Sequence, residues 1–189
     1  MTKLRADARR NRERLLEVAQ AAFASEGLSV QIDEIASRAG VGVGTVYRHF
    51  PTKEALFEAV VSSHKQRLIE KSASLLDHEN PGEALFGFIH HMVEASVMNK
   101  ALADDLASSG VKFDCTDPDA KQELYDAINK LLSRAQQAGA VRSDIGVAEL
   151  LALLSGILLA KTQYAGESGV LRRMTEIVCD GLRGGGSRK

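Results

Sequence analysis

The sequence predicts an all-α protein built from two helical domains. Apolar residues recur three and four positions apart along most of the 189 residues. Glycine and proline occur at intervals that match the length of a helix, and no segment shows the alternation of apolar and polar residues that is typical of a strand. We therefore expect an N-terminal three-helix domain that is joined through a long helix to a larger C-terminal helical domain. We assign residues 1–54 to the first domain, 55–183 to the second and 184–189, which begin GGGS, to a disordered tail.

The first predicted helix carries an apolar stripe and ends near Glu26 and Gly27. The stripe falls at helical spacing and consists of Leu15, Val18, Ala19, Ala22 and Phe23. Before it stands a basic arm that holds Lys3, Arg5, Arg9, Arg10, Arg12 and Arg14. Such an arm suits contact with DNA phosphates or the minor groove, and we assign Arg9 and Arg12 to that role. The alternative is a solvated helix start whose cations pair with Asp7, Glu13 and Glu17.

Residues 31–50 predict two short helices that meet at a glycine-rich turn. Ile32, Ile35 and Ala39 recur at helical spacing, and Gly40 supplies the residue that most easily adopts the left-handed conformation that ends a helix. Val41 can fill the angle between the helices. A second helix of about two turns then runs to Phe50, with a buried stripe formed by Val43, Val46 and Phe50.

The opposite face of this second helix carries hydrogen-bond donors. Thr45, Arg48 and His49 can reach bases or phosphates, and Tyr47 at the boundary can direct its hydroxyl toward a phosphate. Thr52 can cap the next helix, which places Lys53 beside a helix N-terminus, where a phosphate is favoured. The segment therefore predicts a helix-turn-helix that reads DNA, although many all-helical proteins contain two short helices with a glycine turn.

The stretch AGVGVGTVYRHFPTKEAL, from Ala39 to Leu56, resembles the helix-turn-helix signature of the TetR family of transcriptional regulators. The resemblance covers about the first third of the chain closely and the remainder in length and helical character. It implies a homodimeric repressor with an N-terminal DNA-binding domain and a C-terminal domain that dimerises and binds a small, largely apolar effector.

The resemblance also implies roles for individual residues. Thr45, Tyr47 and His49 match the DNA contacts of the family's recognition helix, and Lys53 matches its phosphate-binding lysine. Gln31 departs from the family, which commonly has a threonine that contacts the DNA backbone at this place. The positions that vary within the family, and that are implied to set sequence preference, are Val43, Gly44 and Arg48.

Beyond Lys53 the chain predicts five long helices. They are expected at residues 53–76, 82–107, 119–138, 147–164 and 170–183, and their breaks carry turn or cap chemistry at Asn80-Pro81-Gly82, Asp117-Pro118-Asp119, Gly139 and 166–169.

The helix around Gly156 is apolar on nearly every side. Its uncharged stretch, from Leu150 to Ala160, is far shorter than the roughly twenty residues that cross a bilayer, so a membrane span is excluded. A helix of this kind is buried on two sides, and small residues at every fourth position let a second helix approach closely. With the last helix it is expected to form a four-helix dimer interface, with a central helix of a monomeric bundle as the alternative. The residues assigned to the interface are Ala148, Ala152, Gly156, Leu159, Ala160, Met174, Ile177 and Val178.

The segment after Pro81 offers an adaptable apolar surface with a few polar groups. An effector pocket is expected there, although ordinary core packing explains the same residues. The candidate lining is Phe86, Phe88, Ile89, His90, His91, Met92, Met98, Phe113, Tyr125, Gln163 and Tyr164.

Other functional classes have little support in the sequence. Cys115 and Cys179 provide no disulfide framework, and a reducing cytoplasmic location is expected. His90 and Glu94 could share one helix face, but an ordinary surface or pocket role fits them better than a metal site, and no cofactor is implied. No phosphate-binding loop or nucleophile motif is visible, so the rival hypotheses are an unrecognised enzyme and a helical adaptor that binds only protein. The net charge of −1 argues against a generally basic nucleic-acid coat, but basic residues crowd the N-terminus.

Overall fold

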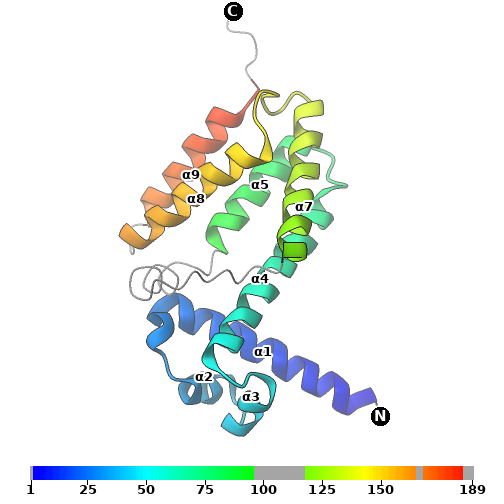
Figure 1. The fold of residues 1–189 in the computed structure, drawn as a ribbon. Helices are drawn as coiled ribbons and strands as arrows, with labels where there is room; N and C mark the ends of the chain where they lie inside the picture. The colour runs from blue at the N-terminus through cyan, green and yellow to red at the C-terminus, as the bar shows by residue number, and fades with distance from the viewer. Residues whose placement is uncertain (1, 96–117, 165–167, 185–189) are drawn as a thin grey trace, which may run out of the picture. The chain divides into compact units, whose positions relative to one another are not determined.

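A computed structural model describes residues 2–95, 118–164 and 168–184 of the chain (Figure 1). In these ranges the regular elements are helices, and the one extended pairing is an isolated antiparallel bridge between Val141 and Arg183. The all-α prediction is confirmed. The helices are α1 (Thr2–Glu26), the 3₁₀ turn η1 (Gly27–Ser29), α2 (Ile32–Ala39), α3 (Val43–His49), α4 (Lys53–Leu75), α5 (Pro81–Glu94), α7 (Pro118–Gln137), α8 (Val147–Gln163) and α9 (Ser168–Leu182).

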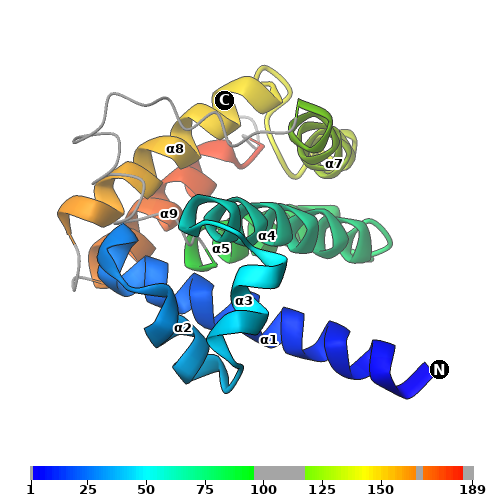
Figure 2. The same cartoon turned by 60° about the horizontal axis from the view of Figure 1, so that its bottom comes forward.

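The first compact unit contains α1, η1, α2, α3 and the beginning of α4. Figure 2 shows α2 and α3 meeting at a tight turn with α1 beside them, as their contacts also indicate. The centre of this unit is apolar, and the rings of Phe23 and Phe57 meet edge to face with their centroids 5.4 Å apart. Around them are buried Leu15, Leu16, Ala19, Ala22, Ile35, Ala36, Val46, Phe50 and Leu56.

The turn between α2 and α3 forms as the sequence predicts. Gly40 has a φ of 67°, a left-handed conformation that costs a glycine little, and α2 ends at Ala39. The Val41 N–H donates to the Ala36 carbonyl at 3.0 Å, and the Val41 side chain packs against the core. The turn therefore fixes where α3 begins.

The boundary between the two units falls within α4, between His64 and Lys65. The expected boundary was after residue 54. The physical reason for the difference is that Leu56, Phe57 and Val60, in the first turns of α4, are buried in the first core. Those turns complete the packing around α1 and belong to the first unit.

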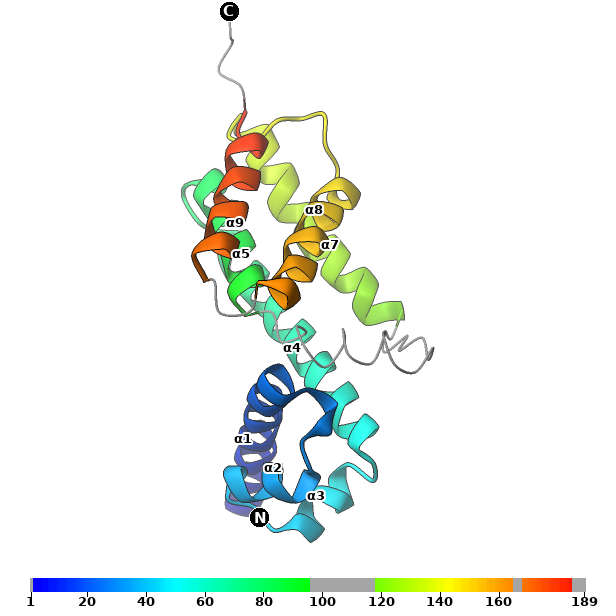
Figure 3. The ribbon, with the colours of Figure 1, turned by 90° about the vertical axis from the view of Figure 1, so that its left-hand side faces the viewer.

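The second unit contains the rest of α4 with α5, α7, α8 and α9. Figure 3 shows α8 and α9 side by side, and α5 contacts α7, α8 and α9. Its core includes the fully or almost fully buried Leu85, Phe88, Ile89, Ile128, Leu131, Leu132, Leu150 and Leu154. The α5 N-terminus is capped as expected, because Asn80 Oδ1 accepts from the N–H groups of Gly82 and Glu83.

The end of α9 is tied to the connection between α7 and α8. The Arg142 N–H donates to the Leu182 carbonyl, and the Gly184 N–H donates to the Ala140 carbonyl, each at 3.0 Å. Gly184 was expected to begin the disordered tail, but these bonds make it part of the fold. Residues 185–189 lie outside the described residues, as do 96–107 of the helix predicted to reach residue 107.

Candidate DNA-binding surface

The second helix of the predicted helix-turn-helix, α3, buries one apolar edge. Val46 is fully buried, Phe50 is 5% exposed, and Val43 packs partly against the first core. This confirms the predicted stripe. Because the stripe fixes how α3 is rotated about its axis, Gly44, Arg48 and His49 are left exposed on the outer side.

The outer face of α3 is open and rich in donors. A Cβ added at Gly44 would meet no atom within 4 Å, so the backbone there is free to approach another surface. Tyr47 is 47% exposed, and Arg48 and His49 form a basic end to the helix. Such a surface can present hydrogen-bond donors to base edges and phosphates.

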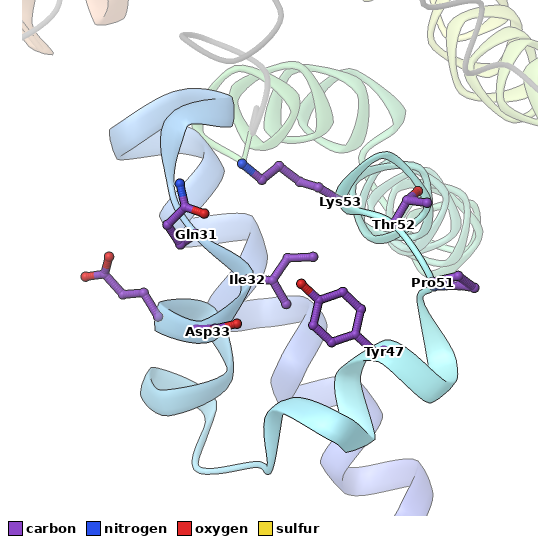
Figure 4. A pocket seen from close by; sticks show the side chains of 8 residues that line it. Gln31, Ile32, Asp33, Tyr47, Pro51, Thr52 and Lys53 are labelled. Atoms are coloured by element: carbon purple, nitrogen blue, oxygen red, sulfur yellow. The ribbon is translucent and has the colours of Figure 1, made fainter.

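Tyr47 and Lys53 belong to a hollow of about 770 Å³ at the start of α2 and α4 (Figure 4). The Tyr47 hydroxyl points toward Ile32 in Figure 4, while Lys53 extends from the first turn of α4 toward the end of α1. The remaining lining comes from Gln31, Asp33, Glu34, Pro51 and Thr52. The hollow therefore brings Gln31 together with Tyr47 and Lys53, the two residues predicted to contact a phosphate.

Lys53 has a partner that its place in the sequence did not reveal. Its Nζ donates to the Leu28 carbonyl of η1 at 2.7 Å, which leaves the ammonium group two further donor directions. Thr52 Oγ1 accepts from the Ala55 N–H at 3.1 Å, which confirms the predicted cap of α4. Carboxylates of Asp33 and Glu34 also line the hollow, so its charge is mixed.

Two residues of the basic arm, Arg12 and Arg14, lie beside the helix-turn-helix. The Arg12 guanidinium stands 5.6 Å from the centre of the Phe50 ring, a cation–π contact at the end of α3. The Arg14 guanidinium lies 3.7 Å from the position that a Cβ on Gly40 would take. Arg9 pairs instead with the exposed Glu13 at 3.5 Å, as the solvated-helix alternative expects. Sequence reasoning did not select Arg14, whose proximity to the turn depends on how α1 packs.

An exposed ion cluster joins α1 to α2. The Arg38 guanidinium donates to the carboxylates of Glu26 and Glu34. The hydrogen bond from Arg38 lowers the pKa of Glu26, and the bonds to Glu26 and Glu34 raise the pKa of Arg38. These contacts link the end of α1 to α2.

The residues predicted for the dimer interface lie on α8 and α9, and together with Leu153 of α8 we call them the apolar face. Leu150, Leu154 and Ile157 turn into the core, whereas Leu159 and Ile177 are 65% and 57% exposed. Ala148, Ala152 and Gly156 are exposed, and Ala160, Met174 and Val178 are half-buried. Leu153, which sequence reasoning did not select, is 46% exposed on α8.

Most of the residues predicted to line an effector pocket are packed in the core, exposed at the surface or outside the described residues. Phe86, Phe88 and Ile89 are packed in the second core, Met92 packs partly against it, and His91 is half-buried. Tyr125 and Tyr164 are 38% and 43% exposed. Met98, Phe113 and the side chain of Gln163 lie outside the described residues.

One predicted pocket residue, His90, lines a hollow in the second unit. This hollow, of about 560 Å³, lies between α5 and α9, and we call it the α5–α9 hollow. It is also lined by Glu94, which the sequence places on one helix face with His90. Its other lining residues, which the sequence pattern did not single out, are Val93, Gly169, Leu171, Arg172 and Thr175.

The described part of the chain offers no cluster of metal ligands and one buried thiol. The described residues contain no group of three or more potential metal-ligating side chains, and none of their helices is long and apolar enough to cross a bilayer. Cys179 is a free, buried cysteine whose pKa is raised by burial, while Cys115 lies outside the described residues.

Comparison with known proteins connects both units to one family. The family of bacterial regulatory proteins named for TetR matches residues 15–60, and the C-terminal domain of SbtR-like transcriptional regulators matches residues 80–184. An HTH-type transcriptional regulator of Staphylococcus aureus (strain USA300) is 30% identical over 126 residues, which cover 65% of this chain and 68% of the relative.

Solved structures agree over nearly the whole length. A TetR transcription regulatory protein from Mycobacterium vanbaalenii is 45% identical with a TM-score of 0.75, and the match covers 95% of this chain and 99% of the other. A TetR transcriptional regulator from Streptomyces coelicolor is 34% identical with a TM-score of 0.74, over 92% and 98% of the two chains. The chain belongs to the TetR family of DNA-binding transcriptional regulators.

Proposed function

We propose that this regulator is a repressor that binds a near-palindromic operator as a homodimer and leaves it when a small, largely apolar effector binds. The observation that carries the proposal is the apolar face of α8 and α9, where Leu159, Ile177 and Leu153 are about half or more exposed. Exposed apolar side chains gathered on neighbouring helices mark a protein contact surface. A two-fold contact between two copies would bury the same face on each.

The dimer sets the length of the operator. Two recognition helices that are related by a two-fold axis meet successive major grooves about 34 Å apart. Each α3 would present Thr45, Arg48 and His49 to base edges, with Val43 and Gly44 in close approach. Tyr47, Lys53 and Gln31 would contact the backbone, and the basic arm with Arg9 and Arg12 would add phosphate or minor-groove contacts.

Effector control requires coupling between the two units. The helix α4 begins with Lys53 at the DNA-binding surface and continues into the second unit. An effector that binds one conformation of the second unit more tightly would increase the population of that conformation. The helix α4 would carry this change to the DNA-binding surface. A difference in affinity of about 1–3 kcal/mol is enough for a 5- to 150-fold change in operator binding.

The proposal is tested with fragments selected from the source genome. Fluorescence anisotropy would measure binding of the purified protein to the selected duplex and to scrambled duplexes over a range of salt. We expect specific, salt-sensitive binding to a near-palindrome. Equal weak affinity for every duplex would refute the proposal, and no measurable binding to any duplex would favour an adaptor that binds only protein.

Variants distinguish contacts with bases from contacts with phosphates. Arg48→Ala should relax the base preference at one operator position. Lys53→Gln should weaken binding to all duplexes to a similar degree, and it should reduce the slope of log affinity against log salt concentration by about one. Glutamine is chosen at Lys53 because its amide can still donate toward the Leu28 carbonyl while the charge is removed. Tyr125→Ala, a comparable exposed truncation on α7, serves as the control and should leave DNA binding unchanged.

A further inference from the structure

The α5–α9 hollow is built within the second unit by two helices that pack against each other. Its volume of about 560 Å³ is within the range of sites that hold small organic ligands, about 300–1,000 Å³. Its walls combine apolar side chains with a few polar groups at the edge, the usual composition of such sites.

The inner wall of the hollow is apolar. Val93 is 6% exposed, and Leu171 packs partly against the core. Thr175 is 1% exposed, and its hydroxyl donates to the Leu171 carbonyl at 2.9 Å. Because this hydroxyl is satisfied by its own helix, the wall does not require a polar partner at that point and can accept an apolar body.

The rim carries charge from both helices. Arg172 on α9 has a side chain that is 77% exposed, and its contact with Glu176 at 3.8 Å is longer than a hydrogen bond. Most of its five donors therefore remain available for a planar acidic group. On α5, His90 and Glu94 are one turn apart and offer an imidazole and a carboxylate.

We propose that the α5–α9 hollow is the effector site and that the effector is a small amphipathic acid. Its apolar body lies against Val93 and Leu171, its acidic group pairs with Arg172, and a hydroxyl or amine at its other end donates to Glu94. The Glu94 carboxylate disfavours a second acidic group at that end, which makes the site directional. This inference rests on the proposed function, because it assumes that the chain responds to an effector.

Direct binding to DNA-free protein tests the site. The probes are 1-anilinonaphthalene-8-sulfonate, an apolar anion, and N-phenyl-1-naphthylamine, which has the same ring skeleton without the sulfonate. Arg172→Gln should weaken binding of the anion about tenfold and leave the neutral probe within twofold. Arg173→Gln is the matched control, since Arg173 pairs with the same Glu176 at 3.4 Å but does not line the hollow, and it should change neither probe.

An occluding variant tests the hollow itself. A Cβ added at Gly169 meets no atom within 4 Å, so Gly169→Trp can project its ring into the hollow without disturbing the helix. Binding of both probes should be lost while the thermal midpoint is kept. Gly87→Trp, at an exposed glycine of α5 that is equally free of close neighbours but lies outside the hollow, should bind both probes normally.

The outcomes distinguish the site from the proposed function. If neither Arg172→Gln nor Gly169→Trp changes the affinity for the probes, the α5–α9 hollow is not the binding site. Binding of the probes to the apolar face of α8 and α9 would give that result. Equal weakening of the two probes by Arg172→Gln would overturn the acidic class. The anion should also weaken operator binding by wild type but not by Gly169→Trp. A bound probe without effect on operator affinity would overturn the effector assignment, whereas a protein with no specific operator would refute the proposed function and leave the probe result intact.

Discussion

Replacing Gly156 by leucine is expected to weaken the dimer while leaving the separate chain at least as stable as before. Gly156 is exposed in the middle of α8, and a Cβ added there meets no atom within 4 Å. In a monomer the leucine would project into solvent, and the helix would gain about 0.5–1 kcal/mol from the loss of a glycine. The free energy of unfolding of the monomer should therefore rise slightly.

The dimer should respond in the opposite direction. The exposed small residues Ala148, Ala152 and Gly156 recur every four positions, so a partner helix can approach this side of α8 closely. Overpacking of a close contact costs about 1–3 kcal/mol for each inserted side chain. Two-fold symmetry places the change in the interface twice, which gives about 2–6 kcal/mol and a Kd weakened by a factor of about 30 to more than 10,000.

Sedimentation velocity over a concentration series measures this Kd. Gly87→Leu is the matched control, because Gly87 is an exposed helical glycine of α5 that also has no atom within 4 Å of an added Cβ. It should share the gain in helix stability and leave dimerisation unchanged. A Gly156→Leu protein that dimerises as tightly as wild type, or more tightly, would refute the close approach of two α8 helices.

Three further predictions concern stability, and urea unfolding measures each of them. Gly82→Ala should lower the free energy of unfolding by about 1–3 kcal/mol, because its Cβ would lie 2.7 Å from the Ala140 Cβ. Thr52→Ala should lower it by about 1 kcal/mol through loss of the α4 cap. The hydrogen bond from Arg142 lowers the pKa of Asp144 to about 2, so the stability from this pair is present above the ordinary Asp pKa of about 3.9 and is lost as pH falls through about 2. Wild type should therefore exceed Asp144→Asn in urea midpoint above about pH 4, and the difference should vanish below about pH 2.

Controls accompany each of these changes. Gly169→Ala adds a Cβ in open space and should not destabilise, so an equal loss in Gly82→Ala and Gly169→Ala would contradict the steric argument. Thr52→Ser keeps a hydroxyl cap and should retain most of the stability that Thr52→Ala loses. In an Arg142→Gln background, Asp144→Asn should lose its pH dependence, and a persistent dependence would assign the effect to another group.

The local signals of the helix-turn-helix were sufficient to predict its form. Gly40 ends α2 because a left-handed residue is needed there, and the spacing of Val46 and Phe50 fixes which side of α3 is buried. Such features depend on residues within one or two helical turns of one another, so the order of the amino acids determines them. The cap by Thr52 follows the same rule.

Contacts between residues far apart in the chain could not be predicted in this way. The bond from Lys53 to the Leu28 carbonyl joins positions 25 residues apart, and Arg14 reaches Gly40 only because α1 crosses the turn. Phe86 met the compositional criterion for a pocket residue, yet it is buried against the core with the Arg183 guanidinium 4.7 Å from its ring centre. Apolar composition alone does not distinguish a core from a cavity wall.

The sequence by itself determined the all-α class, the helix-turn-helix with its donor face, and the apolar character of α8, because periodicity and capping act within a single helix. The tertiary structure decided which apolar residues are used in the core and which remain exposed, where within α4 the first unit ends, and which side chains of α5 and α9 meet around a hollow. These depend on how helices pack, and packing joins residues whose separation along the chain carries no information about their distance in space.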